Sequence, residues 1–434
     1  MLRRPLSPVE ALRVAGASLA AATILSAGMT RRARAACDGT PSPCGGCTGD
    51  PNSFVPQGLG STPFWLTSER WPNTGCPAVE HARHSSPSIP EQVEVVVIGA
   101  GLSGAGATYS LAQRGVSTLL LDARGVSGGA SGRNGGFLGG ATWSQMPVMI
   151  LKMPLIHAYQ TIRLKLANLC FIREFVSKYH VDCDLDCEVD GCSYYGTEEE
   201  FKQAIGWWHY VPRVLLRPFG VHIMEGSSEM REQINLKPRD DAVNGSGPRN
   251  AWGCIRLKKD YDTICAARFV LAVVDQAIAM GAHVFTHTRV EAVEPLPVPT
   301  SNRSRGQVSD ARATVPGFIV KCVDGTTVRC SKVVYATNAY TGSLCPVLAD
   351  KIRPVRNHVL VTTPAPSILK DGSRSGSGSN SGFNYWIQRE DGRIVLGGFR
   401  DKEPCVHIAT EQLLTGWRSE VPCIETPLLF GCVQ

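Results

Sequence analysis

The most constraining stretch of this sequence is residues 93–122, where two apolar runs flank a set of spaced glycines. Val93–Ile98 is almost entirely apolar, as expected of a parallel strand that is buried on both faces. The residues that follow keep apolar side chains at helical spacing up to Arg114, and a second apolar run, Val116–Leu121, ends on Asp122. The pattern predicts a strand, a glycine turn, a helix and a second strand within about 30 residues.

The glycines of this turn meet the needs of a bound dinucleotide. A pyrophosphate is best held by free N–H groups at a helix N-terminus, where side chains would block its approach. We expect Gly99 to allow the tight turn, Gly101 to admit the phosphate and Gly104 to let the helix pack on the strand. Asp122 lies 23 residues after Gly99, near the spacing of about 20 expected for a carboxylate that binds a ribose. The alternative is an ordinary glycine-rich turn, and the turn alone does not distinguish a nicotinamide from a flavin dinucleotide.

The charge of the chain does not indicate a nucleic-acid partner. The formal net charge is +6 over 434 residues, but residues 1–36 contain six arginines and one acid, Glu10. The rest of the chain is therefore nearly neutral and offers no basic binding surface. With 43% hydrophobic residues, the chain is long enough for two domains or two interleaved ones.

Residues 1–36 are predicted to be a targeting segment or a disordered tail. Val14–Met29 is an alanine-rich apolar run, followed by the small-residue pattern Ala33-Arg34-Ala35 that suits signal cleavage. The arginine-rich, acid-poor start also suits an organellar transit peptide. The run is too short to predict a membrane span. Localisation stays open between secretory and organellar targeting, or the cytoplasm if the segment is not a signal.

The 16 cysteines do not form a metal-binding pattern. Cys44-x-x-Cys47 has no second pair at zinc spacing, and the three cysteines within 183–192 lack a matching histidine cluster. We therefore predict no metal site. In an oxidising compartment the cysteines within 37–76 could form disulfides. Buried free thiols are expected at Cys170, Cys254, Cys265 and Cys322.

Outside the glycine turn, apolar spacing predicts further helices and strands. Residues 37–90 are expected to be an extended arm, from which Pro63–Leu66 docks on the core, and Asp324-Gly325 predicts a hairpin turn. The Ser/Gly-rich segments 299–310 and 367–382 are expected to be flexible surface insertions. A helix or a helix pair is predicted over 155–180, and helices are predicted over 201–216 and 261–280. Strands are predicted over 183–195, 283–292, 317–323, 326–330 and 332–336.

Four further motifs follow the glycine turn in a fixed order. They are GASGRNGG at 129–136, VVYATNAYT at 333–341, PVRNHVLVT at 354–362 and YWIQREDGRIVLGGFR at 385–400. With these motifs, roughly residues 61–400 resemble the FAD-dependent oxidoreductases of the D-amino-acid oxidase type, which include glycine and sarcosine oxidases and gamma-glutamylputrescine oxidase. Without the resemblance, SGRNGG would be a flexible loop and ATNAYT a strand end with a polar turn.

The resemblance implies that FAD is the cofactor. The glycine turn and Asp122 would hold the pyrophosphate and the adenosine ribose, and Asp122-Ala123-Arg124 is similar to the family's acid-x-Arg pattern. The loop 131–136 would line the path to the flavin ring, Val290 would contact adenine through its backbone, and Ala336–Asn338 would close over the cofactor. No histidine lies beside SGRNGG, where some relatives attach flavin covalently, so a non-covalent cofactor is expected. The implied cofactor residues are Gly99, Gly101, Gly104, Asp122, Ala123, Arg124, Ser131, Asn134, Gly135, Gly136, Val290, Ala336 and Asn338.

The resemblance also implies oxidation of a small amine or amino acid by hydride transfer to the flavin, with O2 or another acceptor as the final oxidant. No protein acid or base is required if the amine arrives neutral, so no catalytic residue is assigned. An arginine could pair with a substrate carboxylate, although a surface or strand-edge role is the alternative for each one. His358 stands where the family pattern has glutamine. The substrate-contact candidates are Arg353, Arg356, His358, Tyr385, Arg389 and Arg400.

The predicted fold class is α/β with mixed character: a Rossmann-like FAD-binding domain interleaved with an antiparallel-sheet substrate domain. The expected boundaries begin with the targeting segment or disordered tail at 1–36 and the extended arm at 37–90. The FAD-binding domain is assigned to 91–140 and 251–345, the substrate domain to 141–250 and 346–400, and an atypical C-terminal tail to 401–434.

Residues 401–434 depart from the family pattern. In relatives a glycine-rich strand and a helix N-terminus follow here and contact the flavin pyrimidine, and no such pattern is present in this sequence. The expectation is a chain truncated at its C-terminus. From the resemblance, the leading hypothesis is an FAD-dependent oxidoreductase. The alternatives are a non-catalytic or crippled flavoprotein relative and, third, a nicotinamide-dependent enzyme.

Overall fold

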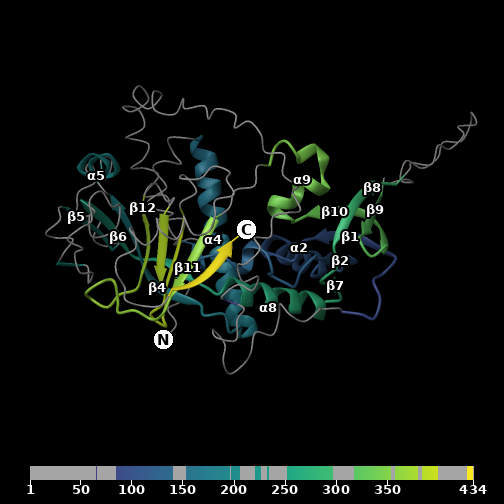
Figure 1. The fold of residues 1–434 in the computed structure, drawn as a ribbon, viewed down its shortest axis with the longest axis horizontal. Coiled ribbons are helices and arrows are strands. Elements are labelled where there is room, and N and C mark those ends of the chain that lie inside the picture. The colour runs from purple at the N-terminus through teal and green to yellow at the C-terminus, as the bar shows by residue number, and fades with distance from the viewer. Residues whose placement is uncertain are drawn as a thin grey trace, which may run out of the picture. The chain divides into compact units, whose positions relative to one another are not determined.

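The computed structural model describes two sheets of the protein and several helices (Figure 1). The chain divides into two compact units, one of which includes Gly139–Tyr179, while the other spans Pro56–Leu138 and His180–Gln434. The predicted targeting segment and most of the predicted arm and tail lie outside the described residues. The described residues are Trp65, 85–139, 153–195, 197–205, 220–225, 232–233, 252–296, 317–352, 357–379, 384–398 and 428–433.

The six-stranded sheet carries the glycine turn. Its strand order is β7-β2-β1-β10-β9-β8. Strands β7, β2, β1 and β10 are parallel, and β10, β9 and β8 form an antiparallel meander. Ile98 is paired with both Leu121 and Tyr335, so three parallel strands end at the same edge of the sheet. The strands are β1 (Gln92–Ile98), β2 (Thr118–Leu121), β7 (His283–Phe285), β8 (Val290–Pro295), β9 (Phe318–Cys322) and β10 (Thr327–Tyr335).

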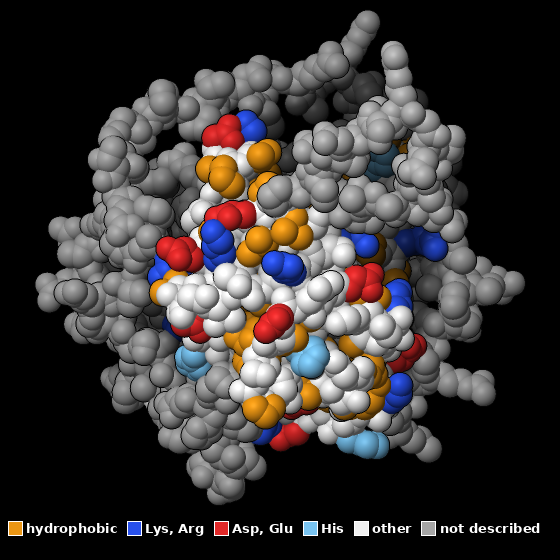
Figure 2. Space-filling model, turned by 90° about the vertical axis from the view of Figure 1, so that its right-hand side faces the viewer, with side chains coloured by type: hydrophobic (Ala, Val, Ile, Leu, Met, Phe, Trp, Pro, Cys, Tyr) orange, Lys and Arg blue, Asp and Glu red, His pale blue; other side chains and the backbone are white. Residues whose placement is uncertain are grey.

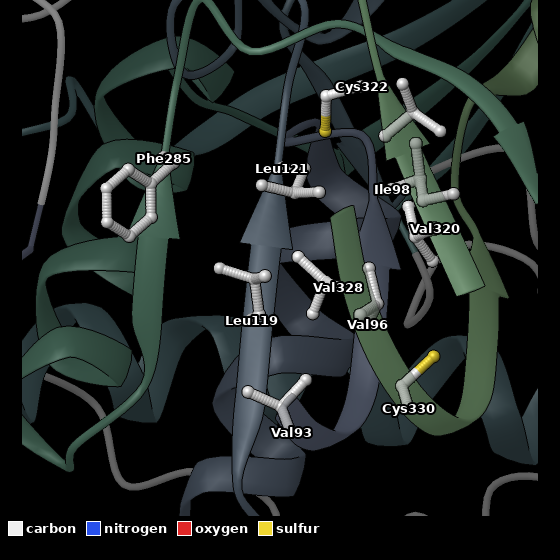
Figure 3. Packing of buried hydrophobic residues seen from close by; sticks show 11 residues of the cluster. Val93, Val96, Ile98, Leu119, Leu121, Phe285, Val320, Cys322, Val328 and Cys330 are labelled. Atoms are coloured by element: carbon white, nitrogen blue, oxygen red, sulfur yellow. The ribbon is translucent and has the colours of Figure 1, made fainter. Parts of the chain in front are cut away.

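One hydrophobic cluster joins all six of these strands, and Figure 3 shows its side chains gathered between them. Val96 and Val97 of β1 point to opposite faces of the sheet and are both fully buried, as predicted from the continuous apolar run. Burial of each such side chain contributes roughly 1.5–3 kcal/mol. Helix α2 (Leu102–Ala112) contacts β1, β2 and helix α8 (Ala266–Ala279). The start of α2 is thereby fixed at the end of β1.

The second sheet has nine strands in the order β15-β11-β14-β13-β12-β4-β6-β3, with β5 paired to β6. The pairs with described registers are antiparallel, apart from the parallel pair of β12 and β4. Together, the two sheets match the predicted mixed α/β class. The strands are β3 (Phe137–Gly139), β4 (Asp186–Tyr195), β5 (Val221–Glu225), β6 (Gly253–Thr263), β11 (Asn357–Thr362), β12 (Ser375–Ser379), β13 (Asn384–Gln388), β14 (Ile394–Gly398) and β15 (Leu428–Val433).

The loop between β2 and β3 carries the chain from the first sheet to the second. It ends at Gly136, whose carbonyl accepts a hydrogen bond from Ile264 N–H at 2.9 Å. Ile264 directly follows β6, and Cys265 is the N-cap of α8, which packs on α2. The loop 131–136 therefore lies where the two sheets meet, close to both the glycine turn and the second sheet.

Two sequence predictions in this region are wrong. The helix predicted over 261–280 begins at Ala266, because Tyr261–Thr263 pairs with β4 as the end of β6. The strand predicted over 283–292 is two strands, β7 and β8, separated by a turn in which His287 has φ +54°. In both segments the spacing of apolar residues does not indicate which neighbouring strand the backbone pairs with.

Two predictions of exposure are also wrong. The segment 367–382 was expected to be a flexible insertion, but its residues Ser375–Ser379 form β12 inside the second sheet. Gly376 has no side chain there, and an added Cβ would lie 3.1 Å from the Phe137 ring. Cys170 is exposed, whereas Cys254, Cys265 and Cys322 are buried as predicted.

The remaining helices are α4 (Leu155–Tyr179) in the first unit and α5 (Glu198–Ile205) in the second. The predicted helix 155–180 is therefore confirmed as one helix, while residues 206–216 of the predicted helix 201–216 lie outside the described residues. Short helical turns follow the glycine-rich loop and β10: η3 (Ala130–Gly132), η6 (Asn338–Tyr340), α9 (Thr341–Leu344) and η7 (Pro346–Leu348).

Figure 2 shows one side of the molecule, on which basic and acidic side chains are interspersed among apolar ones. None of the helices in the described part of the chain has the length and apolar composition needed to cross a membrane.

Candidate functional site

Two glycines of the turn are required by the backbone around them. Gly99 has φ +106°, and a Cβ at this position would lie 2.6 Å from the Ala336 carbonyl oxygen. A Cβ on Gly104 would overlap the Gly99 carbonyl oxygen. The turn is therefore closed by contacts to the end of β10 and to the first turn of α2, as the predicted close packing requires.

Gly101 has a different role, because its φ of −87° is open to any residue. A Cβ on Gly101 would lie 2.9 Å from Ser131 Oγ, and this same oxygen accepts a hydrogen bond from Leu102 N–H at 2.9 Å. Leu102 is the first residue of α2, and the first turn of the helix contains no acidic residue. The positive end of α2 is therefore free of competing carboxylates from its own first turn, and Ser131 lies directly on it.

Asp122 binds the glycine turn through its side chain. Its Oδ2 accepts a hydrogen bond from Ala100 N–H at 2.6 Å, and its Oδ1 accepts one from Arg124 N–H at 2.7 Å. Burial raises the pKa of the Asp122 carboxyl above its ordinary value, against the opposing effect of these two N–H groups. Each carboxylate oxygen keeps a second lone pair, so the group can still accept two further donors.

The other residues predicted to surround the adenosine half also lie near the turn. Ala336 N–H donates to Ile98 O at 2.8 Å, and Asn338, with φ +49°, begins the turn after β10. The Arg124 guanidinium lies 5.8 Å from the centre of the Tyr340 ring, which follows Asn338 by two residues. Val290 is buried in the core of the first sheet at the start of β8. Ala123 lies between Asp122 and Arg124.

The loop 131–136 is held by its own hydrogen bonds. Asn134 Nδ2 donates to the Ser131 carbonyl at 2.6 Å, and Asn134 Oδ1 accepts from Gly136 N–H at 2.8 Å. Gly136 has φ +75°, and its missing side chain leaves room for the Ile264 carbonyl, which would lie 2.5 Å from an added Cβ. The loop is therefore an ordered turn, which excludes the alternative reading of SGRNGG as a flexible loop.

Tyr385 is a substrate-contact candidate that lies beside this loop. Its ring carbon Cε2 would lie 3.1 Å from a Cβ on Gly135, and the ring packs edge-on against Phe137 with the centroids 5.6 Å apart. Phe137 makes a second edge-on contact with Tyr261 at 5.5 Å. Burial, together with the Asp260 carboxylate, raises the pKa of Tyr261, so its hydroxyl stays neutral. Three half-buried rings therefore line the end of the loop.

For four other substrate-contact candidates the structure describes at most the backbone. Only the backbone of His358 is described, in β11 opposite Gly398 and Cys432. Arg353, Arg356 and Arg400 lie outside the described residues.

Arg389 is buried and packs inside the protein. Its guanidinium is 3% exposed, bonds Asp184 Oδ2 at 3.1 Å and lies 4.9 Å from the centre of the Trp65 ring. Sequence reasoning missed Asp184 as its partner and missed the contact of Trp65 with the loop. The only available signal was the apolar PFWL motif within a polar arm.

The residues present fit a bound dinucleotide. The glycine turn leaves a cradle that a Cβ at Gly101 would fill, the helix end is positive, and Asp122 offers acceptors for hydroxyl groups. Among the described ranges, no group of three His, Cys, Asp or Glu side chains could hold a metal ion.

Comparison with known families decides the kind of dinucleotide site. The sequence model of the family DAO, FAD dependent oxidoreductase, matches residues 94–421. The chain belongs to this family. The match begins in β1 and includes the glycine turn, Asp122 and the loop 131–136, so the FAD expected from the resemblance is confirmed at the level of the family.

Individual relatives are distant. The chain is 24% identical over 314 residues to a probable oxidoreductase OrdL of Rhizobium meliloti, a match that covers 71% of this chain and 64% of that protein. Among solved structures it resembles glycine oxidase from Geobacillus kaustophilus, with a TM-score of 0.52 and 18% identity over 79% of this chain and 83% of that one. An L-amino acid deaminase from Proteus vulgaris lacking its specific insertion has a TM-score of 0.51 and 18% identity, over 81% of each chain. At this identity the structural similarity shows the fold alone.

Proposed function

We propose that this protein oxidises a small amine or amino acid by hydride transfer to a non-covalently bound FAD. One observation carries the proposal: the Ser131 hydroxyl joins the first N–H of α2 to the loop 131–136, so the predicted phosphate cradle and the predicted flavin path form one site. Membership of the FAD-dependent family and the fold shared with an amino-acid oxidase and an amino-acid deaminase support it.

The cofactor would be held in three parts. Gly99, Gly101 and Gly104 would admit the pyrophosphate to the α2 N-terminus, and Asp122 would accept hydrogen bonds from the adenosine ribose. The loop 131–136 would lead to the flavin ring. Arg124 and the turn at Ala336–Asn338 would close over the adenosine half, where Val290 would meet the adenine ring.

Bound FAD would supply the two-electron acceptor for a hydride from the substrate C–H bond. The iminium ion left on the substrate would be hydrolysed by water to a carbonyl compound with release of ammonia or an amine, and O2 or another acceptor would restore the oxidised cofactor. The protein would orient the amine and exclude water. Tyr385 and Phe137 are suited to this because their rings lie beside Gly135, at the end of the loop. Because hydride leaves from carbon, a neutral amine needs no protein base.

The domain boundaries remain a proposal. Segments 91–140 and 251–345 would form most of the cofactor half, and 141–250 and 346–400 most of the substrate half. Strands β3 and β6 come from the first pair of segments but lie in the nine-stranded sheet. In this division, these two strands would connect the cofactor half with the substrate half.

The experiment is anaerobic reduction of the flavin-loaded protein by a panel of small amines and amino acids. Bleaching of the flavin absorbance by at least one of them, with recovery of colour when O2 or an artificial acceptor is added, would support the proposal. If FAD stays oxidised with every compound while dithionite still reduces it, the proposed substrate class is wrong.

A further inference from the structure

Trp65 is an arm residue inserted into the core of the nine-stranded sheet. It is 5% exposed and packs in a cluster with residues of β4, β11, β13 and β14, which confirms the predicted docking of PFWL at this residue. Burial alone would give the indole ring a packing role only. The polar contacts of the ring extend beyond this cluster.

The indole N–H of Trp65 is directed at the loop 131–136. It donates to the Asn134 carbonyl at 2.8 Å. The side chain of the same Asn134 donates to Ser131 O and accepts from Gly136 N–H. The hydrogen bond from Trp65 therefore reaches the residue whose side chain fixes the conformation of the loop. A partly buried carbonyl left without this donor would carry a desolvation penalty.

The face of the Trp65 ring holds Arg389. The guanidinium carbon lies 4.9 Å from the ring centre, within the range of a cation–π contact. Arg389 Nη1 would lie 3.0 Å from a Cβ on Gly136 and has no acceptor in the described part of the chain. Among the described residues its carboxylate partner is Asp184, at 3.1 Å. The ring therefore fixes a buried cation against the last residue of the loop.

We propose that Trp65 is a positioning residue for the cofactor, which sets the conformation of the loop 131–136 through Asn134 and through Arg389. This inference rests on the proposed function, because it assumes that the loop lines the path of FAD. Beyond that function, the inference assigns part of the site to a residue of the N-terminal arm, which lies outside the segment that the family model matches.

The test compares Trp65→Phe with Trp386→Phe in the full chain. Trp386 is a suitable control because it is a buried tryptophan of the same sheet, 7% exposed, whose indole N–H finds no acceptor among the described residues. Both variants lose similar packing, but only Trp65→Phe removes a hydrogen bond to the loop. The measurements are the dissociation constant of FAD, the visible circular dichroism of bound flavin, and amide exchange of peptides covering 131–136 in the apoprotein.

For Trp65→Phe we expect FAD binding about tenfold weaker and loop exchange about tenfold faster, with an altered flavin circular dichroism. Trp386→Phe should match the wild-type protein in all three. Trp65→Leu, which also removes the aromatic face over Arg389, should weaken FAD further. Equal effects of the two phenylalanine variants, or a Trp65→Phe protein that matches wild type, would overturn the proposal.

Failure of the proposed function gives a different result. If wild-type protein binds no FAD, that function is wrong, and exchange in the apoprotein alone decides the role of Trp65. Faster exchange in Trp65→Phe would then still support its control of the loop, and unchanged exchange would overturn it.

Discussion

Gly101 offers the cleanest test of the cradle at the level of single residues. Its backbone tolerates a side chain, so Gly101→Ala should leave the fold intact while placing a methyl group 2.9 Å from Ser131 Oγ, where the phosphate would approach. We expect the variant to bind FAD at least about tenfold more weakly, because the methyl group blocks N–H contacts to the pyrophosphate. Fluorescence titration with FAD measures this change.

Gly106→Ala is the matched control for that prediction. Gly106 lies in the same helix with no atom within 4 Å of an added Cβ, and alanine in a helix interior should stabilise the protein by up to about 1 kcal/mol. Its FAD affinity should equal that of wild type. If Gly101→Ala also binds FAD normally, the turn does not hold the phosphate.

Asp122 should make FAD binding depend on pH. Because burial raises its pKa in the free protein and ribose hydroxyl donors favour the carboxylate, binding of FAD should release a proton from the protonated form. Affinity should therefore be full above the raised pKa and fall as the pH is lowered from neutral through it. Titrations at successively lower pH should show the fall in wild type. In Asp122→Asn the binding should be weaker throughout and show less change with pH, and an equal fall in both proteins would assign it to another group.

At the level of elements, the pairing of β4 with β6 depends on a buried ion pair. Asp190 and Arg256 are each 4% exposed, and Asp190 accepts hydrogen bonds from Arg256 Nε and Nη2 and from Lys259 N–H. Asp190→Ala leaves a buried cation with the half-exposed Asp371 as its remaining partner. We expect a loss of roughly 3 kcal/mol in the free energy of unfolding, measured by denaturant titration.

The surface pair of Lys321 and Glu294 supplies the comparison. Both side chains are about half exposed, so Glu294→Ala should cost less than about 1 kcal/mol. A similar loss of stability in Glu294→Ala and Asp190→Ala would show that burial of the Asp190–Arg256 pair has little effect on stability.

The sequence predicts elements well where local pattern and tertiary contacts agree. The run Val93–Ile98, the helix after it and the hairpin at Asp324-Gly325 form as predicted, because each has a local signal: apolar burial, helical spacing or a turn glycine. The predictions for Tyr261–Thr263 and Ser375–Ser379 are wrong because both segments pair with β4, which is distant in sequence, and Ser375–Ser379 also pairs with β13. Their own residues do not carry that information.

At the level of the whole molecule, the cofactor cradle was easier to predict than the substrate side. The glycine turn and Asp122 are 23 residues apart in one βαβ unit, so their contact follows from local structure. Arg389 meets Trp65 and Asp184 across distances in sequence of more than 200 residues. Arg389, which was considered for substrate binding, is buried beside the loop, and only the packing of the second sheet determines this position.

We expect this chain to bind one FAD, non-covalently, at the glycine turn. This can be tested by the flavin content of the purified full chain after incubation with FAD and desalting, followed by release with acid. The protein should be yellow, with about one FAD per chain that leaves with the acid-soluble fraction. A folded protein that stays colourless after incubation with FAD would contradict this expectation.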